Sequence, residues 1–379
     1  MKSSKDLLLL QGPVGPAFDF LQGSLIEKGL NCTRILFNAG DRLFCRKKKN
    51  AINFEGNLED WKEWFNNYLQ LKSPNIVILF GADRPIHSIA RKVCEESEIK
   101  VLCLEEGYFR PGYISIELGG NNASSPIAGK LPASFQEDDF KNLESEEPSS
   151  VSDNSFRNKC WYSFLYYFGS EIWSSTKQKT LSHKQLNLFK QTYFWLRNFI
   201  YWYTKKNKEY EMSKAIRNFD YYLIALQLDS DMQSRFQSNG WKKYDLIKES
   251  MQSFANKAPT ESHLVIKVHP LERGHYNHHY SIKKIAQRLG VEDRVWVIQT
   301  GSIGQLVKFS KGMITINSTS GFSAIFHGVP ILLIGNAIYD NNALVYRLKD
   351  KSDFDYFWWK KNKMGFSDRM KYLKWVKNQ

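Results

Sequence analysis

Short apolar runs alternate with amphipathic stretches along the first third of the chain. The runs have the usual length of buried strands, and they lie at Asp6–Leu10, Thr33–Phe37, Asn75–Phe80 and Lys100–Leu104. Apolar residues at helical spacing predict helices between them, at Phe18–Lys28, Leu58–Leu71 and His87–Glu96. Continuous apolar strands separated by helices indicate a parallel sheet with helices on both faces.

The same alternation returns in the last part of the chain. We expect strands at Tyr221–Leu228, His263–Val268, Val295–Ile298, Gly312–Ile316 and Pro330–Ile334, with helices at Ser281–Leu289, Ile303–Phe309 and Ser320–Phe326. Between the two regions, residues from about 120 to 215 form polar, acidic and then aromatic segments. The pattern predicts an α/β protein with two Rossmann-like domains, 1–217 and 218–379, which face each other across a cleft. The first domain carries a helical aromatic insertion.

The charge of the chain points to an anionic partner. The 379 residues carry a net charge of +14. Seven carboxylates and one lysine lie between residues 136 and 155, so the remainder has a charge of about +20. Such an excess suits a phosphate-bearing substrate, an anionic lipid or a nucleic acid. No zinc, RNP or helix-turn-helix signature accompanies it, so no nucleic-acid partner is expected.

The cysteines and the N-terminal segment indicate a cytoplasmic protein. The five cysteines show no C-x-x-C pair and no regular spacing, which is typical of reduced thiols in the cytosol. The four leucines near the start are too few for a signal sequence or a membrane span. We therefore expect a protein without a membrane span that can still sit on a membrane surface.

Ligands of doubly wound sheets bind at the carboxyl ends of the strands, so the residues there are candidates for a site. Gln11, Gly12 and Gly15 follow the first strand, where glycines let backbone amides approach a ligand; a plain tight turn explains them equally well. The stretch lacks the G-x-G-x-x-G spacing, and no acidic residue follows the second strand at the right place. A nicotinamide cofactor is therefore not expected.

Two adjacent carboxylates, Glu105 and Glu106, end the fourth strand of the first half, just before Gly107. Strand alternation sends their side chains in opposite directions, so only one is expected to reach the cleft. Arg110 could pair with the other. The pair alone suits a structural role slightly better than a catalytic one.

Lys267, His269 and Pro270 end a strand of the second half. Proline stops the strand and holds the imidazole at its carboxyl end, where it could donate to a phosphate or act as an acid; an ordinary turn histidine is the alternative. The nearby H-x-x-H-H spacing resembles a metal site but lacks further ligands. No metal is expected.

Two further motifs follow strands of the second half. Asn317, Ser318, Thr319 and Ser320 precede a helix, where hydroxyls and amides could form a phosphate site; they could also cap the helix, and the two roles are compatible. Gln227 and Asp229 follow the first strand of this half, in a D-x-D context. We favour a loop lining the cleft over a metal–nucleotide site there.

Seven aromatic residues lie within Tyr193–Lys206, next to Arg197, Lys205 and Lys206. Packing between helices is one explanation. A position in the membrane interface is the other, because Trp and Tyr rings bridge apolar and wet regions while lysines meet anionic headgroups.

The motifs E-E-G, H-P and S-T-S, in this order at strand ends, resemble the GT-B glycosyltransferases that use CMP-activated keto sugars. A closer resemblance is to the KpsS-like capsule polysaccharide family, which is related to KpsC. It rests on QGPVGPAFDFLQ, EEGYFRPGYISIE, LQLDSD, KVHPLERG and INSTSGFSAIFHGVPILLIGNAIYD, and it covers nearly the whole chain outside the acidic and aromatic insertion.

The resemblance implies a retaining β-Kdo transferase of GT-B fold. Its donor is CMP-Kdo, its acceptor is a lyso-phosphatidylglycerol or a Kdo-primed lipid, and no cofactor is needed. The related KpsC-type motif reads E-D-G and aligns its Asp with Glu106, which makes Glu106 the candidate nucleophile and His269 the second catalytic residue. Arg110 and Lys267 are candidates for binding the Kdo carboxylate or the phosphate.

The resemblance also implies where the protein works. We expect it on the cytoplasmic face of the inner membrane, at an anionic surface, together with other capsule assembly and export proteins. The alternative is a non-catalytic partner of the same fold that binds the lipid-linked glycan during capsule assembly or export.

Overall fold

The computed structural model describes residues 6–109, 113–132, 153–181, 188–227, 237–269, 272, 277–299 and 301–379. The side chains of 153–157, 159, 188–191 and 195 are outside the description. By its contacts the chain divides into two compact units, Met1–Pro126 with Glu146–Phe189 and Ile127–Ser145 with Lys190–Gln379.

The first unit contains a six-stranded sheet in the order β3-β2-β1-β4-β5-β6. Its strands are β1 (Asp6–Leu9), β2 (Asn31–Leu36), β3 (Ala51–Asn53), β4 (Ile76–Phe80), β5 (Lys100–Glu106) and β6 (Ile114–Leu118). The four predicted strands β1, β2, β4 and β5 are parallel, as is the additional strand β3, but β6 runs antiparallel to β5. Only residues 107–113 separate β5 from β6, and a parallel crossover needs a dozen residues or more.

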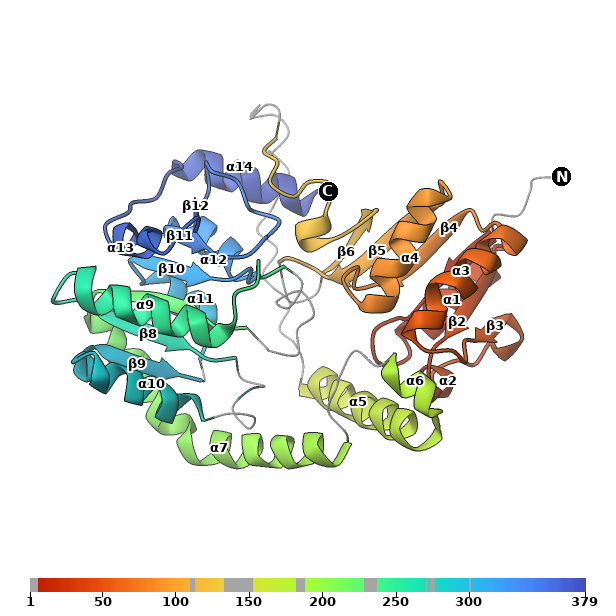
Figure 1. Ribbon diagram of the computed structural model, residues 1–379, viewed down its shortest axis with the longest axis horizontal. Coiled ribbons are helices and arrows are strands. Elements are labelled where there is room, and N and C mark those ends of the chain that lie inside the picture. Colours follow the sequence, from red (N-terminus) through yellow and green to blue (C-terminus); the bar gives the residue numbers. More distant parts are fainter. Residues whose placement is uncertain are drawn as a thin grey trace. The chain divides into compact units, whose positions relative to one another are not determined.

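Helices cover both faces of this sheet (Figure 1). On one face, Phe18 of α1 (Ala17–Glu27) packs on Leu7 and Leu9 of β1. On the other face, Trp61 and Phe65 of α3 (Leu58–Lys72) belong to a core that also includes residues of α4 (Pro85–Glu96). A strand buried on both faces requires an unbroken apolar run, which is why these strands could be predicted.

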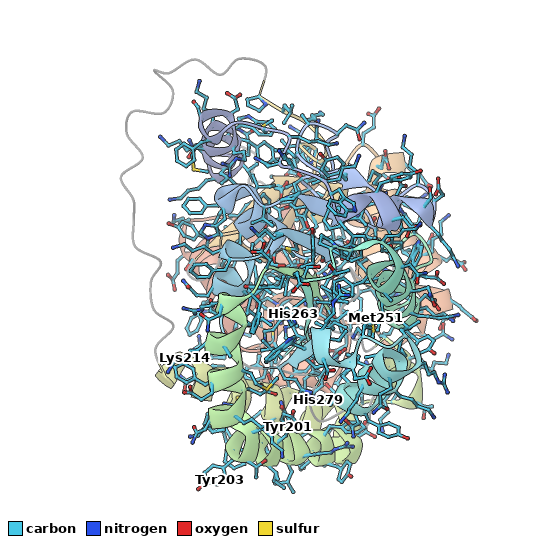
Figure 2. All side chains as sticks on the ribbon, turned by 90° about the vertical axis from the view of Figure 1, so that its left-hand side faces the viewer. Tyr201, Tyr203, Lys214, Met251, His263 and His279 are labelled. Atoms are coloured by element: carbon cyan, nitrogen blue, oxygen red, sulfur yellow. The ribbon has the colours of Figure 1, made fainter. Side chains whose placement is uncertain are left out.

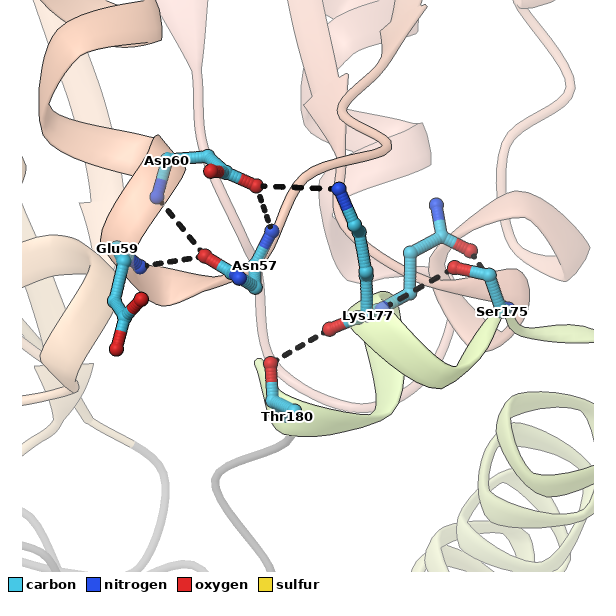
Figure 3. Close-up of polar contacts among 7 residues, drawn as sticks. Asn57, Glu59, Asp60, Ser175, Lys177 and Thr180 are labelled. Atoms are coloured by element: carbon cyan, nitrogen blue, oxygen red, sulfur yellow. Dashed lines mark hydrogen bonds and ion pairs between the residues drawn. The ribbon is translucent and has the colours of Figure 1, made fainter.

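The insertion helices α5 (Asp153–Trp173) and α6 (Thr176–Thr180) pack on the first unit, α5 against α2 (Ala39–Leu43). Figure 3 shows how α6 meets the start of α3. Asn57 and Ser175 each begin a helix with a capping box, and Lys177 Nζ lies 3.8 Å from Asp60 Oδ2. That ion pair is exposed and contributes little to stability. The buried bond from Gln178 Nε2 to Phe54 O, 2.9 Å long, holds α6 more firmly.

The second unit repeats the architecture with six parallel described strands in the order β12-β11-β10-β7-β8-β9. Its strands are β7 (Tyr221–Ala225), β8 (His263–Lys267), β9 (Val295–Ile298), β10 (Gly312–Thr315), β11 (Ile331–Leu333) and β12 (Tyr346–Arg347). Its helices are α7 (Leu188–Ala215), α9 (Lys243–Lys257), α10 (His278–Arg288), α11 (Ile303–Lys308), α12 (Gly321–His327), α13 (Ser352–Phe357) and α14 (Phe366–Lys377).

In both units the first strand is central, with two strands on one side and three on the other. This is the doubly wound order of Rossmann-like domains, so the predicted fold class is confirmed. The division by contacts differs from the boundary expected after residue 217, because α7 groups with the second unit almost entirely. Glu209 of α7 explains this: its Oε2 accepts a hydrogen bond from Gln299 N, 3.2 Å away, just beyond β9.

Among the described helices, none combines the length and apolar character that a membrane crossing requires.

Candidate functional site

Gln11 and Arg84 meet at the point where strand order reverses in the first unit, between β1 and β4. Arg84 Nη1 donates to Gln11 Oε1 over 3.0 Å and to Gly12 O over 2.9 Å. Ligands of doubly wound sheets bind at this reversal, so the position fits a site. Sequence reasoning missed Arg84, although its place just after the apolar run of β4 was a signal.

Gln11 is buried, and its other end joins a polar network. Its Nε2 donates to Asp41 Oδ2 over 3.3 Å and to the Tyr166 hydroxyl over 3.0 Å. That hydroxyl donates to Asp41 Oδ1 over 3.0 Å, and Asn38 Nδ2 donates to it over 2.9 Å. Burial raises the pKa of Tyr166 well above its usual range, which keeps the phenol a donor. Gln11 therefore positions Arg84 and ties the strand end to α5.

The two glycines after β1 have packing reasons of their own. A Cβ on Gly12 would lie 2.4 Å from Phe18 Cγ, so glycine lets α1 approach the turn. Gly15 has a φ of +113°, a conformation that favours glycine. These observations support the tight-turn interpretation.

Glu105 and Glu106 are the last residues of β5, opposite Ser115 and Ile114 of β6. Glu105 Oε1 accepts the Glu106 amide over 3.1 Å. A Cβ added to Gly81 would lie 3.3 Å from Glu105 Oε2 and 3.2 Å from Arg84 Nε. Glu105 therefore points toward the end of β4, and strand alternation directs Glu106 to the other face.

Gly107 continues the hairpin, and its amide donates to Tyr113 O over 2.7 Å. A Cβ there would lie 2.8 Å from the Tyr113 backbone, so the close approach requires glycine. Arg110 lies outside the described residues.

His87 of α4 is fully buried beneath the same strand ends. Its Nδ1 lies 2.8 Å from Gly81 O, and its Nε2 has no hydrogen-bond partner among the described residues. Burial, and then the positive charge of Arg84, lower the pKa of His87 from 6.5 to about 3. The imidazole is therefore neutral and donates from Nδ1 to the loop that carries Arg84.

We expect His87 to make the free energy of unfolding decrease as the pH is lowered. Between the unfolded pKa near 6.5 and the folded value near 3, the unfolded chain binds a proton that the folded chain does not. The free energy of unfolding should therefore lose up to about 1.4 kcal/mol per pH unit below about pH 6.5. His87→Asn keeps a donor near the position of Nδ1 but removes this slope. Urea unfolding at about pH 7 and about pH 5 measures it, and an unchanged slope in the variant would contradict the assignment.

The second unit also gathers polar residues where strand order reverses, between β7 and β10. Asn317 N donates to Gln227 Oε1 over 3.2 Å, which joins the loops after these strands. Lys267 is buried at the end of neighbouring β8, and half-buried His269 follows two residues later, its carbonyl accepting from Glu272 N. These residues therefore lie at or just after the carboxyl ends of strands β7, β8 and β10 of this unit, as predicted from their positions. Asp229 and Pro270 lie outside the described residues.

The loop before α12 is organised around Ser318. Its Oγ accepts from Ser320 N over 3.2 Å and from Ser320 Oγ over 2.8 Å, and its carbonyl accepts from the Tyr339 hydroxyl over 2.5 Å. Thr319 contributes its carbonyl, which accepts from Phe322 N. The capping interpretation is wrong for Ser320, whose side chain accepts no hydrogen bond from the start of α12.

Gly321→Ala should disturb this loop. A Cβ on Gly321 would lie 2.2–2.7 Å from the buried Tyr339 ring, so Tyr339 must shift and weaken its bond to Ser318. We expect a loss of about 1–3 kcal/mol, the usual cost of overpacking, measured by chemical denaturation. Gly304→Ala is the matched control, because its Cβ would meet nothing closer than 3.5 Å. Equal stability of the two variants would contradict the packing argument.

The histidines of the H-x-x-H-H spacing belong to two separate clusters. His278 Nε2 lies 3.5 Å from Glu272, and His279 Nε2 lies 3.9 Å from Glu209. Within the described ranges, no three His, Cys, Asp or Glu side chains group as metal ligands would. His275 lies outside those ranges.

Comparisons with known proteins match these motifs to one family. Residues 75–370 match the family described as capsule polysaccharide biosynthesis protein. The chain is 32% identical over 353 residues to the capsule polysaccharide export protein KpsS of Escherichia coli, covering 91% of this chain and 88% of KpsS. It is 28% identical over 368 residues to the capsule polysaccharide modification protein LipB of Neisseria meningitidis serogroup A, covering 94% and 86%.

Among solved structures, the similar ones include the KpsC β-Kdo 2,7 transferase of Thermosulfurimonas dismutans. The identity is 12% and the TM-score 0.43, with 97% of this chain and 89% of that chain covered. A score this low supports no inference about function.

The alignments cover 88% of KpsS and 86% of LipB. The family match spans most of this chain, including the carboxylate, histidine and serine motifs. The resemblance to KpsS-like proteins is confirmed. This chain belongs to the capsule polysaccharide biosynthesis protein family.

Proposed function

We propose that the protein is a glycosyltransferase that moves Kdo from CMP-Kdo to a lyso-phosphatidylglycerol, or to a Kdo-primed lipid, with retention of configuration. The observation that carries the proposal is the grouping of the three motifs at strand ends within two doubly wound units. Glu105 and Glu106 end β5 of the first unit. In the second, His269 follows β8 and Asn317–Ser320 follow β10, the strands on either side of β7. Family membership supports a role in capsule synthesis. The choice of Kdo as the transferred sugar rests on the resemblance to KpsS-like proteins.

The second unit would bind the donor. CMP has one phosphate, which develops negative charge as the sugar leaves. His269 and Lys267, together with the amides and hydroxyls of the Ser318 loop, are donors suited to that charge without a metal. Asn317 and Gln227 would hold this loop in place, because their hydrogen bond joins the two strand ends.

The first unit would supply the catalytic carboxylate. In the proposed reaction Glu106 attacks the anomeric carbon, the bond from that carbon to the phosphate oxygen breaks, and CMP leaves. An acceptor hydroxyl then displaces Glu106, its proton passing to a base. Two displacements retain the configuration. Glu105 would have a structural role, since one of its oxygens already accepts the Glu106 amide.

The Kdo carboxylate needs a cation, and we propose Arg110 or Lys267 for it. Arg84 is a further candidate in the first unit, because its guanidinium lies at the strand reversal near Glu105. With a lipid acceptor, the enzyme would work on the cytoplasmic face of the inner membrane, with other capsule assembly and export proteins as its partners.

CMP release from CMP-Kdo tests the proposal. Purified protein should release CMP when lyso-phosphatidylglycerol is added and much less without it. UDP-sugars should give no release. A titration with CMP in a calorimeter separates the alternative, because a non-catalytic glycan-binding partner has no need of CMP. Absence of both CMP release and CMP binding would overturn the proposal.

A further inference from the structure

Helix α7 carries a row of exposed apolar side chains, which we call the outer stripe: Tyr193, Leu196, Phe199, Ile200, Tyr203 and Tyr210. Their exposed fractions lie between 53% and 66%. They recur at spacings of three, four and seven residues, so they share one side of the helix. Packing within a core, one of the two interpretations of this segment, is therefore wrong for these side chains.

The opposite side of α7 packs on its own unit. The ring centre of Tyr201 lies 6.4 Å from that of His279 on α10, and buried Glu209 binds Gln299 N. In Figure 2, Tyr201 lies on the side of α7 that faces His279, whereas Tyr203 points away from the ribbon. The inner side thus fixes the orientation of the helix, and the outer stripe faces outward.

Cations lie over and beside the aromatic rings of this surface. Lys206 Nζ lies 4.8 Å from the ring centre of Trp202, and Lys214 Nζ lies 4.3 Å from that of Tyr210. Lys205 and Lys208 lie instead on the packed side of α7, in a pocket with Tyr201 and Glu209. Of the two acids in this part of α7, Glu209 is buried and Glu211 pairs with Lys214 at 3.3 Å. The exposed surface is therefore aromatic and basic.

An anionic bilayer suits this composition better than a protein partner. Tyr and Trp rings favour the membrane interface, and lysines gain from anionic headgroups. Protein interfaces, by contrast, are depleted in lysine. No described helix is suited to cross a bilayer, whereas an amphipathic helix can lie in its surface.

We propose that the outer stripe of α7 docks the protein on an anionic phospholipid surface, with its rings in the headgroup layer and its lysines against the lipid phosphates. The inference deepens the proposed function and rests on it in one respect: a lipid acceptor gives the docking a purpose. The contacts that carry it lie within α7 and between α7 and the rest of its own unit.

Flotation with vesicles tests the docking. The full chain should float with vesicles of phosphatidylglycerol and phosphatidylethanolamine, and remain below with vesicles of phosphatidylcholine. Phe199→Ser combined with Tyr203→Ser should lower the bound fraction strongly, since both rings are exposed and their loss leaves the packed side of α7 unchanged. Tyr356→Ser combined with Phe366→Ser is the matched control, because these exposed rings belong to other helices of the unit. Equal loss in both double variants, or none in the first, would overturn the proposal.

Charge gives a second arm. Lys206→Glu combined with Lys214→Glu should weaken partitioning by about tenfold or more, at about 1 kcal/mol for each basic residue near the surface. Added salt should weaken the binding of the unaltered chain. Binding that ignores both charge and salt, or the absence of any vesicle binding, would assign the stripe to a protein partner instead.

The docking and the proposed transfer fail in different ways. With a detergent-dispersed acceptor, the Phe199 and Tyr203 double variant should release CMP at the normal rate while it no longer floats. Lost transfer with normal flotation contradicts the proposed function alone, and normal transfer from vesicles without flotation contradicts the docking alone.

Discussion

Replacing Glu106 by glutamine is expected to lower the rate of CMP release by about a thousandfold or more. The amide keeps the size of the side chain but removes the nucleophilic oxygen, so no covalent glycosyl intermediate can form. CMP should bind as before, because the donor residues lie in the second unit. Steady-state CMP release and a CMP titration of the same preparation measure both quantities.

Glu105→Gln is the matched control at the adjacent position. Its amide oxygen can still accept the Glu106 amide, as Glu105 Oε1 does now. We expect most of the activity to remain and a modest loss of stability. If Glu105→Gln abolishes turnover and Glu106→Gln does not, the catalytic role belongs to Glu105.

The second large effect is expected from Asp41→Ala. Asp41 is buried and accepts hydrogen bonds from Gln11 Nε2, the Phe37 amide over 3.0 Å, and the Tyr166 hydroxyl. Its removal leaves these donors buried without an acceptor, at about 1–3 kcal/mol each when no water replaces it. We expect a total loss of about 3–5 kcal/mol, measured by urea unfolding.

Two further variants serve as comparisons for Asp41→Ala. Tyr166→Phe removes one hydroxyl from the same network and should cost less than Asp41→Ala. Asp220→Ala removes an exposed carboxylate that pairs with Lys311 at 3.1 Å, and it should change stability by less than about 1 kcal/mol. A small effect of Asp41→Ala, similar to that of Asp220→Ala, would contradict the structural role of the network.

The central strands of both sheets could be predicted because each is an apolar run buried on two faces. Of the four strands at the described sheet edges, β9 was predicted, whereas β3, β6 and β12 were not. β3 and β12 have three and two residues, too few for any pattern, and both lie at sheet edges. β6 alternates apolar residues with Ser115 and Glu117, and a neighbouring loop satisfies Glu117 through the Tyr108 hydroxyl, which donates over 2.5 Å. Such contacts depend on the tertiary structure.

The candidate site was predictable only as far as strand ends determine it. Gln227 and Asn317 follow neighbouring strands, and their contact follows from strand order. Tyr166 lies 155 positions from Gln11 in the sequence, and no local pattern announces their hydrogen bond. The Rossmann-like order explains why polar residues gather at these ends, whereas the docking of the insertion helices depends on side-chain contacts that periodicity does not reveal.

The central claim is that Kdo passes from CMP-Kdo to a lipid. Mass spectrometry of the lipid acceptor after incubation with purified protein and CMP-Kdo tests it most directly. We expect a product heavier than lyso-phosphatidylglycerol by a Kdo residue, formed by the unaltered chain and absent with Glu106→Gln. An acceptor of unchanged mass, with either lyso-phosphatidylglycerol or a Kdo-primed lipid, would contradict it.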